Sequence, residues 1–125
     1  MVQRSMFPLV FSLLLIMGCA AAKIIGGPIL TKNLKDGVYD GKARVGPVKV
    51  LARVTIQNQQ VTNIRLLEHR NLKGKAAENI ILHRIIEEQS TRVDAVSGAT
   101  VSSTAIMNAV NDAIQTANLK TEHNH

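Results

Sequence analysis

The residues most able to do chemistry lie in one run, Asp94 to Ser103, which reads DAVSGATVSS. Gly98 and Ala99 carry almost no side chain, so a bulky group can approach the backbone beside the Thr100 hydroxyl. An amphipathic segment follows, and the first N–H groups of a helix attract anions because they lack intrahelical acceptors. The run therefore predicts a helix N-terminus that suits a phosphate.

A helix cap explains the same residues without any ligand. The side-chain oxygen of Ser97 or Thr100 could accept a hydrogen bond from an unpaired backbone N–H, an interaction worth about 1 kcal/mol. A serine hydrolase has less support, because the run is not a G-x-S-x-G elbow and His69 and His83 have no evident acid partner in the sequence. From the residues alone, the cap and the anion site both stay open.

Three β-branched segments must form the sheet that positions this run. Alternation over Val48 to Ile56 predicts a half-buried strand, and Val61 to Leu67 returns after a polar turn as its hairpin partner. Residues 36–45 predict a shorter strand broken by Gly37 and Gly41. One face of the second strand carries Val48, Val50, Ala52, Val54 and Ile56. We expect an antiparallel sheet.

Two segments with helical periodicity, Lys75 to Gln89 and Ser102 to Ala117, complete the predicted fold. The apolar stripe of the second consists of Ile106, Ala109, Val110, Ala113, Ile114 and Ala117. Its polar side carries Asn108, Asn111, Asp112 and Gln115. The predicted fold class is α+β, a single domain with a small antiparallel sheet packed with two helices.

The N-terminus has the pattern of an export signal. Arg4 precedes the apolar stretch Phe7 to Met17, which is too short to span a membrane, and Gly18 precedes the only cysteine, Cys19. These residues resemble a bacterial lipobox, so we expect a lipoprotein signal over 1–18, lipidation of Cys19 and a membrane-anchored protein. Cleavage after Ala22 is the alternative and would release a soluble exported form. We expect a flexible tether over 19–35, the folded domain over 36–118 and a disordered tail over 119–125.

Composition excludes several classes of function. Once the signal is removed, Tyr39 is the only aromatic residue, so stacking platforms for nucleic acid are missing despite the net charge of +6. With Cys19 lipidated or discarded, the domain has no thiol for a disulfide, an iron–sulfur cluster or a cysteine zinc site. We predict neither nucleic-acid binding nor a metal site.

Several motifs resemble the bacterial FMN-binding domain family. The residues that match its acceptor signature are Asp94, Ala95, Val96, Ser97, Gly98, Ala99 and Thr100, followed by Ser103. Those similar to its opening D-G-x-Y-x-G are Asp36, Gly37, Tyr39 and Gly41, and Glu68 with His69 is similar to an E-H pair that closes a strand. The family includes the C subunit of the sodium-pumping NADH:quinone oxidoreductase and the G subunit of the Rnf complex.

The resemblance implies that FMN is joined through its phosphate to the oxygen of Thr100. A separate magnesium-dependent flavin transferase makes this bond from FAD, and Asp94 is a candidate for recognition by that enzyme. The cofactor-binding residues implied are Thr100, Ser97, Gly98, Ala99, Asp94 and Ser103, with Tyr39 and His69 as candidate flavin neighbours. A core position is the alternative for Tyr39, and a surface position for His69.

The implied function is electron transfer by a carrier that is not itself an enzyme. It would pass electrons between a membrane donor and an extracytoplasmic acceptor, with the flavin supplying the redox chemistry. Two alternatives stay open: a flavin-bearing accessory subunit of an exported reductase, and a structural or binding lipoprotein without flavin.

Overall fold

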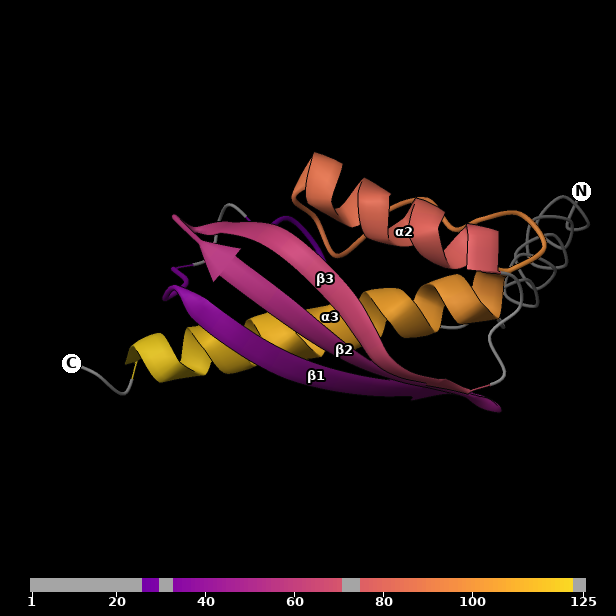
Figure 1. The fold of residues 1–125 in the computed structure, drawn as a ribbon, viewed down its shortest axis with the longest axis horizontal. Helices are drawn as coiled ribbons and strands as arrows, with labels where there is room; N and C mark the ends of the chain where they lie inside the picture. Colours follow the sequence, from indigo (N-terminus) through magenta and orange to yellow (C-terminus); the bar gives the residue numbers. More distant parts are fainter. Residues whose placement is uncertain (1–25, 30–32, 71–74, 123–125) are drawn as a thin grey trace, which may run out of the picture.

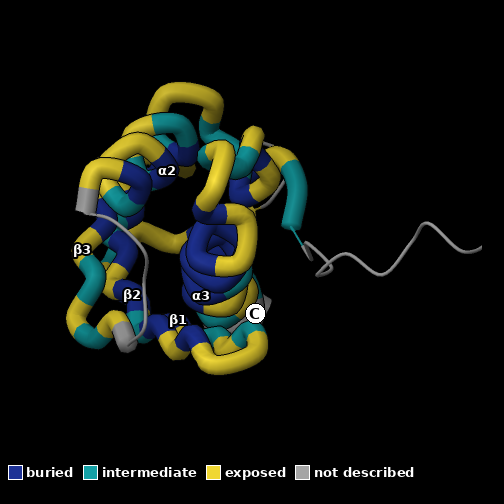
Figure 2. Tube along the Cα trace, turned by 90° about the vertical axis from the view of Figure 1, so that its right-hand side faces the viewer, coloured by how far each residue is buried: buried dark blue, intermediate teal, exposed yellow. Residues whose placement is uncertain are grey.

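The computed structural model in Figure 1 describes residues 26–29, 33–70 and 75–122. Its elements follow in the order β1 (Gly37–Val45), β2 (Val48–Gln57), β3 (Gln60–Arg70), α2 (Lys75–Glu88) and α3 (Thr100–Glu122). The strands form one antiparallel sheet in the order β1-β2-β3. Both helices pack on one side of the sheet, with α3 along β1 and β2 and α2 beside β3 (Figures 1 and 2). The predicted α+β fold, a small sheet with two helices, is confirmed.

Strand β2 supplies the centre of the core. The five residues predicted to share one face are all buried: Val48, Val50, Ala52, Val54 and Ile56. The turn into β3 uses Asn58 and Gln59, whose φ angles of 53° and 66° are both positive. Two positive φ angles in a two-residue loop are typical of a type I′ turn, which matches the twist of a hairpin. The predicted hairpin is confirmed.

Gly41 does not break β1, which contradicts our expectation of an interrupted strand. The strand runs unbroken from Gly37 to Val45, and Gly41 lies buried in its middle. A Cβ atom at Gly41 would overlap the backbone of Ala109 and Ala113 in α3. Gly41 therefore lets the helix backbone rest directly on the strand, and this is a long-range requirement that the strand's own sequence does not reveal.

Helix α3 is longer than predicted at both ends. It starts at Thr100, and the predicted apolar stripe is buried throughout. Asn111, predicted on the polar side, is also buried and lies 3.3 Å from the Thr91 hydroxyl through its side-chain oxygen. The helix continues to Glu122, so the expected disordered tail is wrong for residues 119–122, while 123–125 lie outside the described residues.

The expected flexible tether is also wrong where the structure describes it. Ile29 and Leu34 are buried in the core, where they remove apolar surface from water. The Ile29 N–H donates to the Gln89 carbonyl at 2.8 Å, and the Thr91 N–H donates to the Gly27 carbonyl at 3.0 Å. The predicted signal and Cys19 lie outside the described residues. Within the described ranges, no helix is both long and apolar enough to cross a bilayer.

Candidate functional site

A tight turn presents the start of α3. The Ala99 N–H donates to the Val96 carbonyl at 2.9 Å, which closes a four-residue turn. Gly98 occupies its third position with φ of +80°, the positive value that a type II turn requires and that glycine adopts without strain. A Cβ atom there would meet nothing within 4 Å, so the space beside Gly98 is open.

The Ser103 side chain holds this turn in place through hydrogen bonds to its backbone. Its side chain is buried, and its hydroxyl donates to the Ala99 carbonyl at 2.7 Å while accepting from the Val96 N–H at 3.1 Å. The Ser103 N–H also bonds to the Ala99 carbonyl, at 2.9 Å. Both ends of the turn are therefore bonded to one side chain. Ser103 is a positioning residue for Thr100, and its buried hydroxyl is already fully engaged by the backbone.

Thr100 is the first residue of α3, and it is exposed. Its hydroxyl has no hydrogen-bond partner among the described residues, and neither does that of Ser97, which is also exposed. The N-cap position is Ala99, which has no side-chain oxygen, so the alternative of a cap by Ser97 or Thr100 is not supported by the structure. The first N–H groups of the helix are left without a side-chain cap from either residue.

A cavity of about 450 Å³ opens beside Thr100. It is lined by the β1–β2 hairpin and by the start of α3: Pro47, Val48, Gly98, Ala99, Thr100, Val101 and Ser102. Its volume lies within the usual range of small-molecule sites, and its lining combines apolar side chains with a hydroxyl and helix N–H groups. The helix dipole adds a positive potential at this end, which favours a phosphate.

Asp94 lies outside the cavity lining, on the connection that leads into the turn. Its side chain is exposed and forms no ion pair with any described residue. Its backbone carbonyl accepts from Arg84 Nη1 at 2.7 Å, which ties the connection to α2. The Asp94 carboxylate is thus exposed to solvent, two residues before the turn formed by residues 96–99.

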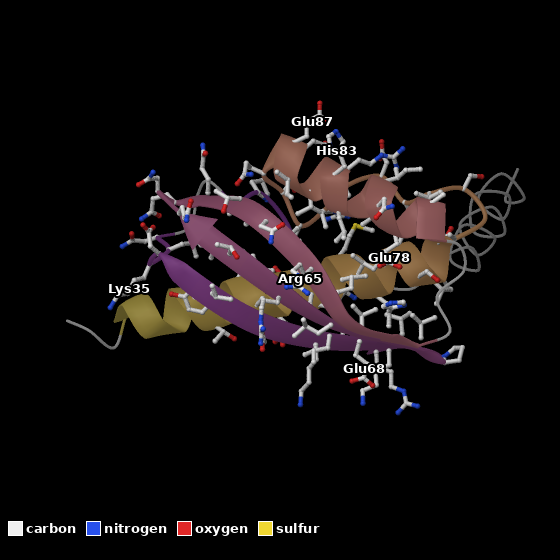
Figure 3. All side chains as sticks on the ribbon, in the orientation of Figure 1. Lys35, Arg65, Glu68, Glu78, His83 and Glu87 are labelled. Carbon is white, nitrogen blue, oxygen red and sulfur yellow. The ribbon has the colours of Figure 1, made fainter. Side chains whose placement is uncertain are left out.

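A β-bulge turns His69 toward the helices. Leu51 pairs with Glu68 and Ala52 with Leu66, so Leu67 is an extra residue that shifts the register. Bulges of this kind re-aim the side chains that follow them. Glu68 consequently faces outward, whereas Glu78 of α2 lies on the other side of β3 (Figure 3).

Beyond the bulge, His69 pairs with Val50, whose side chain is buried on the helical face. His69 Nδ1 lies 4.0 Å from Glu78 Oε2, so the imidazole has the acid partner that the sequence did not reveal. Val48, which lines the cavity, is a diagonal neighbour of His69 on this face, and such neighbours are about 7–8 Å apart. His69 itself is not among the residues that line the cavity.

Tyr39 does not join the site. It is buried, and its hydroxyl donates to the Lys35 carbonyl at 2.9 Å. Gly41 contacts α3 at Ala113, thirteen residues from Thr100, which is roughly 20 Å at the helical rise. Tyr39 lies farther still along β1. Tyr39 therefore occupies the core position given as the alternative, and it is not among the residues that line the cavity beside Thr100.

Sequence reasoning missed the contribution of the β1–β2 hairpin to the cavity. Gly46 and Pro47 are typical of a turn between two strands, and nothing local in the sequence indicates that this turn meets the start of α3. Within the described ranges, no group of three His, Cys, Asp or Glu residues could hold a metal ion.

Comparison with known proteins identifies the cofactor that this site binds. The model of the FMN-binding domain family matches residues 45–115, which is more than half of the chain. The chain belongs to the FMN-binding domain family. All residues that line the cavity fall within the matched range, and so do the turn and Ser103. FMN is therefore the cofactor, and a flavin-dependent electron-transfer function follows for this FMN-binding domain.

One relative gives a second comparison. An uncharacterized protein of Treponema pallidum (strain Nichols) is 34% identical over 85 residues, which are 66% of this chain and 24% of that protein. The matched part of this chain thus spans about a quarter of the length of this relative.

Proposed function

We propose that this chain is an exported electron carrier in which FMN is bound covalently to Thr100 through a phosphodiester. The observation that carries the proposal is the state of the Thr100 hydroxyl: it is exposed, without a partner among the described residues, and beside a cavity at a helix N-terminus. A hydroxyl needed only for structure would be used as a cap, and this one is not.

The attachment step requires a second enzyme. A bond forms between Thr100 Oγ1 and the FMN phosphorus of FAD, the pyrophosphate bond breaks, AMP leaves, and the hydroxyl proton passes to a base. Among the residues lining the cavity, none is a carboxylate or a histidine. We therefore assign the base and the magnesium to a flavin transferase, in keeping with the positioning and charge stabilisation that phosphoryl transfer needs. The exposed Asp94 carboxylate is a suitable recognition point for that enzyme.

The chain's own residues hold the product in place. The N–H groups of Thr100 and Val101 begin α3 and have no acceptor within the helix, so they suit the negative charge of a phosphodiester. Pro47 and Val48 supply apolar surface on the opposite wall of the cavity. When bound, the flavin supplies the one- and two-electron chemistry. The covalent bond keeps its local concentration high, so a site with no aromatic side chain suffices.

Export and anchoring complete the proposal. Six residues lie between a lipidated Cys19 and Gly26, which packs against Thr91, and the seven residue steps reach at most about 25 Å when fully extended. An anchored domain would then stay close to the membrane, where it could take electrons from a membrane donor and pass them to an extracytoplasmic acceptor. Cleavage after Ala22 would give a freely diffusing form of the same carrier.

Intact mass measurement tests the proposal. The full chain is coexpressed with a flavin transferase, exported, denatured and weighed, and we expect an increment of one FMN less one water. Thr100→Val should abolish the increment, because it removes the attacking oxygen with little change in shape. Ser97→Ala is the matched control, since this hydroxyl is also exposed and unpartnered in the described structure, and it should leave the increment in place. An increment that survives Thr100→Val would refute covalent attachment at this residue.

A further inference from the structure

The outer face of the sheet is not covered by either helix of the described structure, because α2 and α3 both pack on the other side (Figures 1 and 2). Among the side chains that the structure describes, five cationic ones lie on this outer face: Lys42, Arg44, Lys49, Arg53 and Arg65. Asp40 and Glu68 are the carboxylates among them, and Glu68 is visible on this side in Figure 3. The face therefore carries an excess of positive charge.

The two carboxylates neutralise only part of this charge. Asp40 receives two hydrogen bonds from the Arg53 guanidinium, at 2.9 and 3.0 Å, and Glu68 lies 3.9 Å from Lys49 Nζ. The other cations, Lys42, Arg44 and Arg65, form no ion pair with a described residue. The unpaired charge is greatest toward the β1–β2 hairpin.

Lys42, Arg44 and Lys49 form what we call the basic cluster. Arg44 and Lys49 are direct partners in the β1–β2 register, and like charges in that arrangement destabilise a sheet. With Ala43, mainly the aliphatic parts of these three side chains border a hollow of about 250 Å³. Cations placed opposite each other on neighbouring strands have an electrostatic cost in the isolated chain, and an anionic partner would relieve it.

The basic cluster adjoins the flavin site through the hairpin. Arg44 and Lys49 flank the segment 45–48, and two residues of that segment, Pro47 and Val48, line the cavity beside Thr100. A protein that docks on the cluster would therefore meet the rim of the flavin cavity. Electron transfer requires a short distance between the flavin and the redox group of the partner, and docking at this position would provide it.

We propose that the basic cluster docks a redox partner protein through a carboxylate-rich surface on that partner. That the partner is a redox protein rests on the proposed electron-carrier function. That its surface is acidic rests only on the charges of the basic cluster.

An anionic membrane is the less suitable occupant of the cluster. Residues 26–29, which follow the lipidation site, pack against Gln89 and Thr91 on the helical side of the molecule. Anchoring would then direct the outer face of the sheet away from the bilayer (Figure 2). Complementary charge would mainly raise the association rate, and salt would weaken it.

Binding to a defined acidic probe tests the proposal. Fluorescent poly-glutamate represents the acidic protein surface, and its affinity for the FMN-loaded chain is measured at low and physiological salt. The variant Arg44→Gln/Lys49→Gln should weaken binding at least tenfold. The control Lys35→Gln/Arg92→Gln removes the same net charge from exposed positions away from the cluster and should weaken it less than twofold. Equal losses for the two double variants would overturn the proposal, because total charge alone would then explain binding.

Two further arms separate the possible failures. Vesicles rich in anionic phospholipid should bind the chain more weakly than poly-glutamate, and a preference for vesicles that the Arg44→Gln/Lys49→Gln variant abolishes would assign the cluster to a membrane instead. The Thr100→Val chain should bind poly-glutamate as well as the flavin-loaded chain does. If the unmutated chain carries no flavin after coexpression with the transferase, the covalent proposal fails. If both chains still bind poly-glutamate, the docking surface stands.

Discussion

The two ends of the β1–α3 layer are built for different purposes. At the Tyr39 end, the only aromatic ring beyond the predicted signal is buried and its hydroxyl is bonded to the Lys35 carbonyl. At the Thr100 end, a hydroxyl without a partner in the described structure faces a cavity of about 450 Å³. The difference teaches that the fold buries its one ring in the core and leaves the other end open, where we propose that FMN is attached covalently.

A substitution at Gly41, which lies between the two ends, should have the largest effect on stability, because it displaces the helix that joins them. Gly41→Ala adds a Cβ atom where the backbone of Ala109 and Ala113 already lies, so α3 must move away from β1. We expect a loss of about 3 kcal/mol in the free energy of unfolding, measured by urea denaturation. Gly27→Ala is the control, because a Cβ atom there would meet nothing within 4 Å. Equal losses for the two variants would mean that the close approach at Gly41 has no energetic importance.

Ser103→Ala should damage the Thr100 end selectively. It removes both side-chain bonds that fix the turn, at a cost of about 1–3 kcal/mol, and should slow FMN attachment at least tenfold in a time course with purified transferase. Thr91→Val is the matched control. It removes a buried hydroxyl bonded to Gly27, away from the turn, so it should lower stability without slowing attachment. Attachment at the normal rate in Ser103→Ala would contradict the positioning role.

Tyr39→Phe should affect the other end alone. It removes the hydrogen bond to Lys35 and is expected to cost about 1 kcal/mol of stability, while the absorption spectrum and reduction potential of the attached flavin stay unchanged. A shift in either flavin property would place the ring of Tyr39 close to the cofactor and remove the contrast between the two ends.

Much of the fold could be predicted from local sequence patterns. The rest depends on contacts between residues that are far apart in the sequence. The alternation in β2 predicted which side chains are buried, because one strand face is enough to define that pattern. Gly41 was taken for a strand breaker, since only the approach of α3 explains it. Residues 26–35 resembled a tether because the burial of Ile29 and Leu34 depends on partners far along the chain.

The proposal of Thr100 as the acceptor residue comes from motif similarity rather than from physical patterns in the sequence. A hydroxyl before a helix is most simply a cap, and the sequence could not reveal that Ala99 takes this position while Ser103 holds the turn. His69 shows the same limit, because the bulge that turns it toward Glu78 depends on pairing between β2 and β3.

The smallest expected effect lies on the outer face of the sheet, near the Tyr39 end. The Arg53 guanidinium, mainly by donating hydrogen bonds to the carboxylate, holds the pKa of Asp40 below its ordinary value of 3.8. The pair therefore stabilises the fold above that pH, and its contribution is lost as the pH falls through the lowered pKa. Because both side chains are well exposed, Asp40→Asn should change the urea midpoint only slightly at pH 7, and not at all in strong acid. A large change at pH 7 would show that this surface pair matters more to folding than its exposure allows.

Fragmentation of the flavin-bearing peptide is the most direct measurement of the central claim. The exported chain is digested, the flavin peptide is isolated by its absorbance, and fragment masses locate the phosphodiester among the hydroxyls of residues 97–104. We predict that the whole increment lies on Thr100, which is exposed and unpartnered among the described residues, and none on the buried Ser103 and Thr104. Flavin on another hydroxyl, or a flavin released intact when the chain is denatured, would contradict the account.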